Sequence, residues 1–586
     1  MSEPLLKPSE QDEEDVLYYD FRASKENSEM SLLSKRFATI ATAACFLVLS
    51  AVGVASAFTR STFGKQISLQ ADKLNLEAMN DAIDGPRRNV ILMISDGFGP
   101  ASETYSRSYY QHINNLTYDH MMPLDTIHVG QSRTRSASSL VTDSAAGATA
   151  FSCAMKTYNG AIAVDVDQTA CGTVLESAKL HKKMLTGLVA TSRITHATPA
   201  SFSSHVVDRD MEDQIATQQI GDYPLGRTID LMFGGGYCHF LPNTTSGSCR
   251  EDERNVWAEA TQKYGWKTAL QTRSEFDELD SKAQLPLFGL FTPDKLLTYT
   301  CASQHMSYEI DRIEDKEPSL REMSEKALNI LREATGGSDQ GFFLMIEGSR
   351  IDMAAHSNDA SAHVHDIFAY HETVDMVKRF VEENPGTILI STSDHETGGF
   401  SIARQVSTAY PEYLWFPDVI TRVKNSTIVL AQAITTLKGI AYEEKKSMVL
   451  NTILKDGLGI EDATDDELAF LLSSTSSAAA LDHYLADMVS IRAQLGWATH
   501  GHSGVDVNLY AYGAGADLLR GSHENTNIGS FIQHFLELDL QDITSKLAAD
   551  NSTFHKQYQD GAKKAIVHDH LDHYHHDESK LNHPSH

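Results

Sequence analysis

Six short apolar runs, rich in β-branched residues, alternate along the chain with segments whose apolar positions have a helical spacing. Runs of this kind are typical of strands buried on both faces of a parallel sheet. They span residues 90–95, 185–191, 229–233, 342–346, 387–391 and 505–512. Helical patterns separate them, for example at 319–334 and 359–383. The alternation predicts an α/β fold, a large and mostly parallel central sheet flanked by helices, with all six runs as parallel strands.

Acidic side chains and a histidine follow three of these runs. Asp96 comes after the first run, Glu347 after the fourth, and Asp394 and His395 after the fifth. Ligands of a parallel sheet bind beyond the carboxyl ends of its strands. We therefore expect these side chains to meet in one site at that edge of the sheet.

The same pattern divides the chain into segments. Residues 1–36 are polar and rich in Ser and Glu, which predicts a disordered tail. Residues 59–86 are interpreted as a stem, and the folded domain is expected over 87–560. Polar helical stretches break the alternation at about 400–495, which indicates an inserted subdomain. The histidine-rich segment 561–586 is interpreted as a disordered or removable tail rather than a metal-binding one.

One segment has the length and composition of a membrane anchor. Residues 37–58 carry no charge and follow Lys35-Arg36, and they are long enough to cross a bilayer as a single helix. A cleaved signal peptide is the alternative, because Ala55-Ser56-Ala57 resembles a cleavage site. The run is longer than a usual signal sequence, however, and a 36-residue tail precedes it. We therefore expect an uncleaved anchor with a cytosolic N-terminus, as in a single-pass type II membrane protein.

Sequons and cysteines support a lumenal or extracellular location for the folded domain. All four glycosylation sequons lie beyond the anchor, at Asn115, Asn243, Asn425 and Asn551. Five of the six cysteines also lie beyond it, in a part of the chain where disulfides can form. The expected pairs are Cys238 with Cys249 and, second, Cys153 with Cys171, and Cys301 is then left over.

The net charge limits the classes of partner. The chain has a formal net charge of −30 at pH 7, which argues against nucleic acid as a specific partner, because phosphate backbones are bound by clustered Lys and Arg. A small phosphorylated substrate is compatible with this charge, since bound divalent cations reverse the local field.

Several motifs contain the residue types needed for metal-assisted phosphoryl transfer. Ser144 begins the small-residue run SAAGATA, which suits a nucleophile at the start of a helix. Asp352 and His356 are four residues apart, so a helical turn would place both on one face, where they can bind one metal. His500 or His502, just before the last apolar run, can complete such a site, since a catalytic zinc usually has three protein ligands.

A further motif spans residues 193–209. Arg209 has the planar fork that binds phosphate, and the hydroxyl of Thr198 suits magnesium. Structural alternatives exist for both: Thr198-Pro199 often starts a helix, and Arg209 lies between Asp208 and Asp210, which would also fit a surface ion pair.

Seven segments together resemble the alkaline phosphatase family and occur in that family's order. They cover about residues 88–535 and read VILMISDGFG, VTDSAAGATA, RITHATP, DLMFGGG, IEGSRIDMAAH, STSDHETGG and THGHSGVDV. The resemblance implies an alkaline phosphatase fold and a phosphomonoesterase of broad substrate range. It also implies small phosphorylated substrates, a phosphoserine intermediate and a homodimer.

The resemblance assigns a role to each motif residue. Ser144 matches the serine that becomes phosphorylated, and Arg209 matches the arginine that clamps phosphate. Two Zn²⁺ and one Mg²⁺ per chain are implied, with ligands Asp352, His356 and His502 for the first zinc, Asp394, His395 and Asp96 for the second, and Asp96, Thr198 and Glu347 for magnesium. His502 is preferred to His500 because Ser-Gly follows it.

Two residues depart from patterns common in the family. His196 stands where bacterial members of the family have an aspartate near the magnesium. Animal members have a histidine at this position. Met353 stands where members often have a Lys or His that helps to hold phosphate through water, so that contact is expected to be missing or supplied elsewhere.

Three functional alternatives follow from the motifs. A phosphodiesterase or sulfatase of the same superfamily would share the metal ligands, but Ser144 with a complete third metal set favours monoesters. A non-catalytic metal-binding ectodomain would have lost Ser144 or Arg209, and both are present.

The anchor and histidine-rich tail resemble the fungal vacuolar members of the family, so the vacuole membrane is the expected location, with the cell surface as the alternative.

Overall fold

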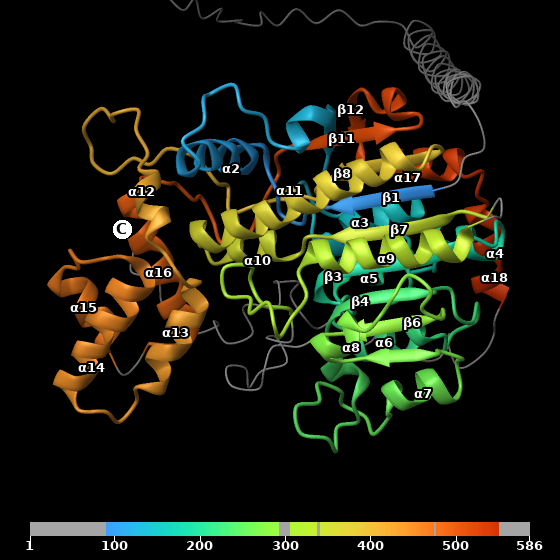
Figure 1. Cartoon of the computed structure of the whole chain (residues 1–586), viewed down its shortest axis with the longest axis horizontal. Coiled ribbons are helices and arrows are strands. Elements are labelled where there is room, and N and C mark those ends of the chain that lie inside the picture. The colour runs from blue at the N-terminus through green and yellow to red at the C-terminus, as the bar shows by residue number, and fades with distance from the viewer. Residues whose placement is uncertain (1–88, 292–304, 337–339, 474–475, 550–586) are drawn as a thin grey trace, which may run out of the picture. The chain divides into compact units, whose positions relative to one another are not determined.

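A ten-stranded sheet forms the centre of the structure, a computed structural model that describes residues 89–291, 305–336, 340–473 and 476–549 (Figure 1). Its strand order is β12-β2-β11-β8-β1-β7-β3-β4-β6-β5. The strands are β1 (Asn89–Ile94), β2 (His128–Arg133), β3 (Leu185–Arg193), β4 (Leu231–Gly235), β5 (Thr268–Leu270), β6 (Leu287–Leu290), β7 (Phe342–Glu347), β8 (Thr387–Thr392), β11 (Val507–Gly513) and β12 (Gly521–Glu524). The expected N-terminal tail, anchor and stem lie outside the described residues, as do the histidine-rich tail, Cys301 and Asn551.

Five of the six apolar runs are parallel strands, as predicted. These are β1, β3, β4, β7 and β8. The prediction of a parallel strand at 505–512 is wrong, because β11 is antiparallel to both β8 and β2. The insertion leaves the sheet beyond the carboxyl end of β8, and the chain returns at the same edge, so the next strand must run in the opposite direction.

The four strands that the sequence pattern missed are short or polar. Strand β12 ends one side of the sheet and β2 lies next to it, with few buried positions in either strand. Strand β5, which has three residues, ends the other side. Strands with a solvated face alternate polar with apolar residues instead of forming apolar runs.

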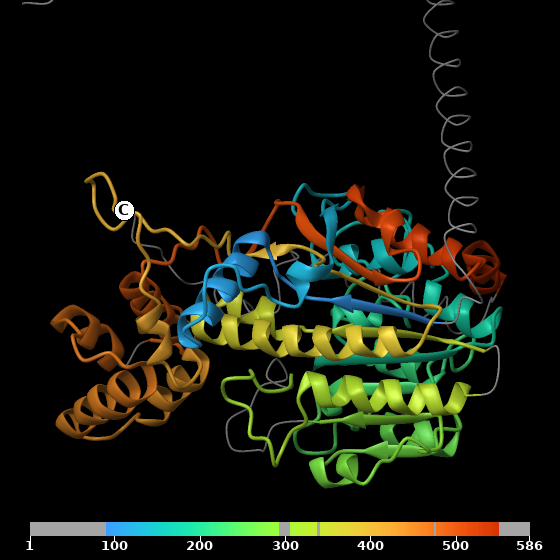
Figure 2. The same cartoon turned by 45° about the horizontal axis from the view of Figure 1, so that its top comes forward.

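Helices cover both faces of the sheet because the strand side chains alternate between them. In β1, Val90, Leu92 and Ile94 belong to one apolar cluster, which contains residues of α3, α4 and α17. Ile91 and Met93 belong to a second cluster, on the opposite face, with α9 and α11. In both views α9 and α11, drawn in yellow-green and yellow, lie together on one face (Figures 1 and 2). The layered α/β architecture is confirmed.

The helices before the insertion are α2 (Pro100–Ile113), α3 (Ser144–Cys153), α4 (Val174–Leu180), α5 (Ala197–Ala200), α6 (Glu212–Ile220), α7 (Val256–Gln262), α8 (Arg273–Asp277), α9 (Leu320–Thr335), α10 (Arg350–His356) and α11 (Ala360–Glu383). Both predicted helices, α9 and α11, are present, and Ser319 and Asp359 cap their N-termini. The helices at the end of the described chain are α17 (Asn525–Phe535) and α18 (Leu540–Ala549).

The segment after β8 forms a helical subdomain with its own core. Its helices are α12 (Pro417–Thr421), α13 (Thr427–Thr436), α14 (Tyr442–Met448), α15 (Asp465–Leu472) and α16 (Ala478–Ala493). A third apolar cluster joins α12, α13, α15 and α16 and includes Leu430, Leu454 and Leu485. The same cluster reaches Tyr105 in α2 and Val364 in α11, so the subdomain packs directly on helices of the sheet domain.

Both expected disulfides are present, Cys153–Cys171 and Cys238–Cys249. The first joins the end of α3 to a loop 18 residues further along the chain. Across the described ranges, no helix combines the length and the hydrophobicity that a membrane crossing requires.

Candidate active site

Three adjacent strands bring the predicted acidic residues together. Strand β1 lies between β7 and β8 in the sheet. Asp96 follows β1, Glu347 ends β7, and Asp394 and His395 follow β8. His395 Nε2 lies 3.5 Å from Asp96 Oδ1 and 3.3 Å from Asp394 Oδ2. The carboxyl edge of the sheet therefore holds the cluster that the strand pattern predicted.

A second group forms where α10 meets the chain that leads to β11. Asp352 and His356 lie one turn apart on α10, with His356 Nε2 3.3 Å from Asp352 Oδ2. His502 Nε2 lies 3.8 Å from Asp352 Oδ1 and 3.2 Å from His356 Nε2. His502 reaches this edge because β11 is antiparallel; before a parallel strand it would lie at the opposite edge.

The hydrogen bonds of these two histidines indicate a cation between them. The Nδ1 atom of His502 lies 2.8 Å from the carbonyl oxygen of Thr142, and that of His356 lies 2.5 Å from the carbonyl oxygen of His500. Each Nδ1 must therefore carry the proton, which leaves Nε2 as an acceptor in a neutral ring. Two acceptor nitrogens and a carboxylate that face one another at these distances suit a bound metal ion.

A third group lies where β1, β7 and the start of α5 converge. Ligand atoms of Asp96, His196 and Glu347 all lie within 4.8 Å of one another. Thr198 in α5 is fully buried, and its hydroxyl has no hydrogen-bond partner in the part of the chain that the structure describes. Among the described residues, no donor makes a hydrogen bond to either carboxylate oxygen of Asp96. A buried carboxylate of this kind is costly unless a cation compensates it.

The protonation of the site follows from burial and charge. Burial, with the neighbouring carboxylates, raises the pKa of Asp96 well above its ordinary value. Burial raises the pKa of Glu347 to about 7, and burial with the charge of Asp352 raises that of Asp394 to about 6. Burial alone would also raise the pKa of Asp352, but His356 and His502 lower it. The four buried carboxylates therefore fit a site that binds divalent cations.

Ser144 lies at the first position of α3, beside this cluster. Its Oγ is 3.0 Å from His395 Nε2. Asp143 caps the helix by accepting from the backbone N–H of Ala146, at 3.0 Å. Gly147 allows α3 to approach the metal-ligand loop, because a Cβ there would lie 3.0 Å from the Cβ of Asp394. The helix N-terminus, which attracts negative charge, thus faces the site.

Arg209 is fixed beside Ser144 rather than at the surface. Its Nη1 donates to Asp143 Oδ2 at 3.1 Å, and its Nη2 lies 3.1 Å from His196 Nε2. The side chain is 8% exposed. The guanidinium is therefore buried, pairs with Asp143, and lies between the serine and the third acidic group.

The comparisons with known proteins agree with this geometry. The family model described as "Alkaline phosphatase" matches residues 87–538. The chain belongs to the alkaline phosphatase family. It is 47% identical over 460 residues to an alkaline phosphatase of Schizosaccharomyces pombe, covering 78% of this chain and 83% of that one. It is 45% identical over 515 residues to the repressible alkaline phosphatase of Saccharomyces cerevisiae, covering 84% and 88%. The alkaline phosphatase structure from Thermus thermophilus matches with a TM-score of 0.64 and 27% identity over 80% of this chain and 97% of that chain.

The fold of this chain places every predicted site residue in this cluster. His500 does not face it in the same way as His502. The Nδ1 of His500 lies 2.8 Å from the backbone oxygen of His356, and its ring stacks on His483. His500 therefore contacts the backbone of His356, whereas His502 directs its Nε2 into the cluster.

Met353 lies away from the reacting groups of the alkaline phosphatase. It is 2% exposed and packs with Tyr308, Ala354 and Ala362. Its sulfur accepts a hydrogen bond from Arg350 Nη1 at 2.8 Å. The side chain of Met353 is therefore directed to Arg350 and to this apolar cluster.

Sequence reasoning missed two residues that hold the site of the alkaline phosphatase. Asp143 joins the start of α3 to Arg209, and an aspartate directly before a helix is a recognisable N-cap signal. Thr397 donates its hydroxyl to Asp352 Oδ1 at 2.5 Å. No local signal marks Thr397, because this contact joins residues 45 positions apart.

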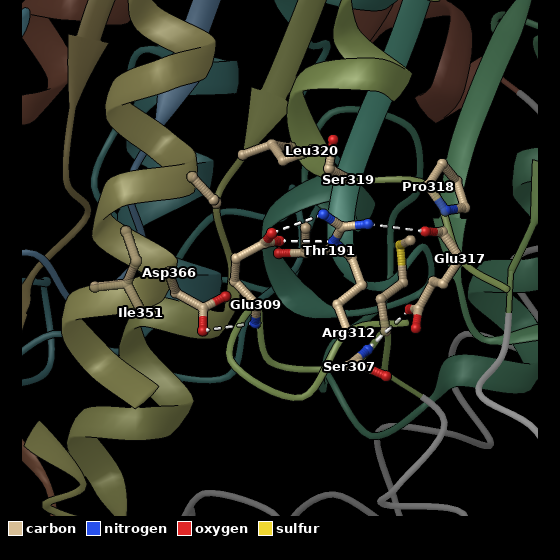
Figure 3. Close-up of a pocket in the computed structure, with 13 residues that line it drawn as sticks. Thr191, Ser307, Glu309, Arg312, Glu317, Pro318, Ser319, Leu320, Ile351 and Asp366 are labelled. Atoms are coloured by element: carbon tan, nitrogen blue, oxygen red, sulfur yellow. Dashed lines mark hydrogen bonds and ion pairs between the residues drawn. The ribbon is translucent and has the colours of Figure 1, made fainter. Parts of the chain in front are cut away.

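A separate small pocket on the far side of α10 has no room for a substrate. It lies between Thr191, Ile351 and Asp366, under the loop that precedes α9 (Figure 3). Its volume is 10 Å³, enough for about one water molecule. Arg312 donates to Glu309 above it. The candidate active site is therefore the cluster around Ser144 and not this pocket.

Proposed function

We propose that this alkaline phosphatase hydrolyses phosphate monoesters through a phosphoserine at Ser144. The observation that carries the proposal is the position of Ser144 Oγ. It lies at a helix N-terminus, 3.0 Å from His395 and beside Arg209 and three groups of metal-ligand side chains. Such a serine combines a nucleophile, a positive helix end and an anchored cation for phosphate.

The side chains fit two Zn²⁺ and one Mg²⁺ per chain, as the family resemblance implies. Asp352, His356 and His502 would hold the first zinc, and mixed His and carboxylate sets suit that ion. Asp96, Asp394 and His395 would hold the second. The oxygen donors of Asp96, Thr198 and Glu347 suit magnesium. Bound there, these cations would lower the pKa of the Ser144 hydroxyl and of water and would stabilise the departing oxygen.

Arg209, Ser144 and the N-terminus of α3 bind the phosphoryl group and carry out its transfer. Arg209 binds two oxygens of the phosphoryl group, and Asp143 holds its guanidinium in place. Ser144 Oγ attacks phosphorus in line with the departing alcohol, and the P–O bond to the alcohol breaks. Water then attacks the phosphoserine, the bond to Ser144 Oγ breaks, and inorganic phosphate leaves. The N-terminus of α3 favours the negative charge in both steps.

The test compares Ser144→Ala with the parent enzyme on an aryl monophosphate and on an aryl diester, from low to high pH. The parent should hydrolyse the monoester faster than the diester, should lose activity on chelation, and should regain it with zinc and magnesium. Ser144→Ala should lose nearly all activity while it retains its metals. Near-native turnover by the variant, or activity indifferent to chelation, would refute the proposal.

We also propose a location and an assembly state, on the basis of sequence features and family resemblance. The uncharged stretch 37–58, with all four sequons beyond it, supports a type II membrane anchor and a lumenal catalytic domain. The resemblance of the uncharged stretch and the histidine-rich tail to the fungal vacuolar members supports the vacuole membrane, with the cell surface as the alternative. A homodimer is proposed from the family alone. Protease protection of the catalytic domain in intact organelles, with cleavage of the N-terminal tail, tests the topology.

A further inference from the structure

Helix α16 of the insertion contacts the turn that follows a proposed metal ligand. Ser357 comes directly after His356 and is 2% exposed. Its Oγ donates to Asp482 Oδ2 at 2.7 Å, across 125 residues of sequence. Asp482 lies on α16 and is 1% exposed. Loss of this hydrogen bond would leave a buried polar group without its partner, which is costly.

Helix α16 also contacts the loop that carries His502. The ring of His483, next to Asp482, stacks on the ring of His500 with centroids 3.9 Å apart. His500 and His356 are in turn joined by two contacts, from each Nδ1 to the other residue's backbone oxygen, at 2.5 and 2.8 Å. The two proposed zinc-ligand segments are therefore joined to each other and to α16.

Ser490 makes a third contact, further along α16 than Asp482 and His483. Ser490 donates to the backbone oxygen of Asn358 at 3.4 Å and accepts from Trp497 Nε1 at 3.0 Å. Trp497 packs against Gly398, since a Cβ on Gly398 would lie 2.4 Å from its ring. The helix thus contacts the segments that follow His356 and His395 and precede His502.

The polar contacts around Asp482 require a defined protonation pattern. Thr427 Oγ1 lies 2.6 Å from Asp482 Oδ1 and 3.0 Å from Asp359 Oδ2, but a hydroxyl has only one proton to donate. Burial raises the pKa of Asp359, but three backbone N–H groups donate to its carboxylate and stabilise a negative charge there. A neutral Asp482 that donates to Thr427 satisfies every atom. Burial raises the pKa of Asp482 to about 7, in the same direction.

We propose that α16 is a positioning element for the first metal site, with Asp482 as its principal residue. Asp482 holds Ser357, and through the turn it holds the imidazole of His356 in the orientation that faces Asp352 and His502. The inference rests on the proposed role of His356 and His502 as metal ligands. Residues that orient metal ligands typically change metal affinity by about 10–100-fold when they are lost.

The experiment measures the rate at which zinc passes from the metal-loaded enzyme to a chelator, with a metal-sensitive dye. Asp482→Ala and Ser357→Ala should each release zinc about tenfold faster than the parent. The double variant should release it no faster than Asp482→Ala, because that substitution already removes the contact with Ser357. Asp482→Asn should behave like the parent, since its amide donates to Thr427 and accepts from Ser357.

Two controls separate the outcomes. Asp487→Asn changes a carboxylate of the same helix that pairs with Arg404 and is 51% exposed, and it should leave zinc release unchanged. His356→Ala should bind less zinc than the parent, and an unchanged zinc content would refute the ligand assignment itself. If His356→Ala loses zinc but Ser357→Ala releases it at the parent rate, the positioning role is wrong and the proposed function stands. Ser357→Ala removes one oxygen only, so it decides the question even if Asp482→Ala fails to fold.

Discussion

Replacement of Arg209 by alanine should reduce kcat/KM for an aryl phosphate by about 10²–10³-fold. The guanidinium is held by Asp143 at 3.1 Å and lies beside His196, so its direction is set before substrate binds. Two hydrogen bonds from a guanidinium to a phosphoryl group, each worth about 1.5–3 kcal/mol, amount to at least about 3 kcal/mol. At 1.36 kcal/mol for each tenfold change, a loss of about 3–4 kcal/mol gives this range.

The assay is initial-rate hydrolysis of 4-nitrophenyl phosphate, with the inhibition constant of inorganic phosphate as a second readout. The value of kcat/KM should fall and the inhibition constant of phosphate should rise, because Arg209 binds substrate and product oxygens alike. Arg209→Lys retains the charge without the planar fork and should lose about tenfold. The control is Arg520→Ala, which removes an exposed arginine paired with Asp517. If Arg209→Ala stays within about threefold of the parent on both readouts, the phosphate-clamp reasoning is refuted.

Three further predictions concern the metals and the backbone. His502→Ala should lose bound zinc in metal analysis, whereas His500→Ala should retain more of it; the reverse order would exchange their roles. In metal-free protein burial raises the pKa of Glu347 to about 7 and of Asp394 from 3.8 to about 6. The folded form then binds protons more tightly than the unfolded chain, so stability falls as pH rises from about 4 to about 7. The Tm of chelated protein should be lower at pH 8 than at pH 5, and zinc with magnesium should raise it more at pH 8; a pH-independent Tm contradicts this. Gly97→Ala should cost about 2–5 kcal/mol of unfolding free energy in urea titration, because φ is +74° and a Cβ would lie 2.6 Å from an α-carbon of α10; an unchanged midpoint contradicts it.

The central strands and their chemistry were predictable because burial leaves a clear signal in the sequence. Strands β1, β7 and β8 are buried along their length, and an acidic residue at or just after the end of each marks the carboxyl edge of the sheet. Asp96, Glu347 and Asp394 were found in this way, and parallel packing brings them together. Family resemblance then supplied the roles that a pattern of apolar positions does not contain.

Direction and long-range contacts were not predictable in the same way. The apolar run of β11 is the same whether the strand is parallel or antiparallel, yet its direction decides whether His502 reaches the site. The hydrogen bond from Ser357 to Asp482 joins residues 125 positions apart, and neither residue belongs to a motif. Contacts of this kind depend on how the insertion packs on α11, which a local pattern does not encode.

The central claim is that Ser144 carries the phosphoryl group between two displacements. The direct measurement is mass spectrometry of the peptide that contains Ser144, after the enzyme has been mixed with an aryl phosphate and quenched rapidly in acid. The account predicts a mass increase of one phosphoryl group on Ser144 in the parent, and none in Ser144→Ala. A parent enzyme that turns over substrate while this peptide stays unmodified, or that carries the phosphoryl group on another residue, would contradict the account.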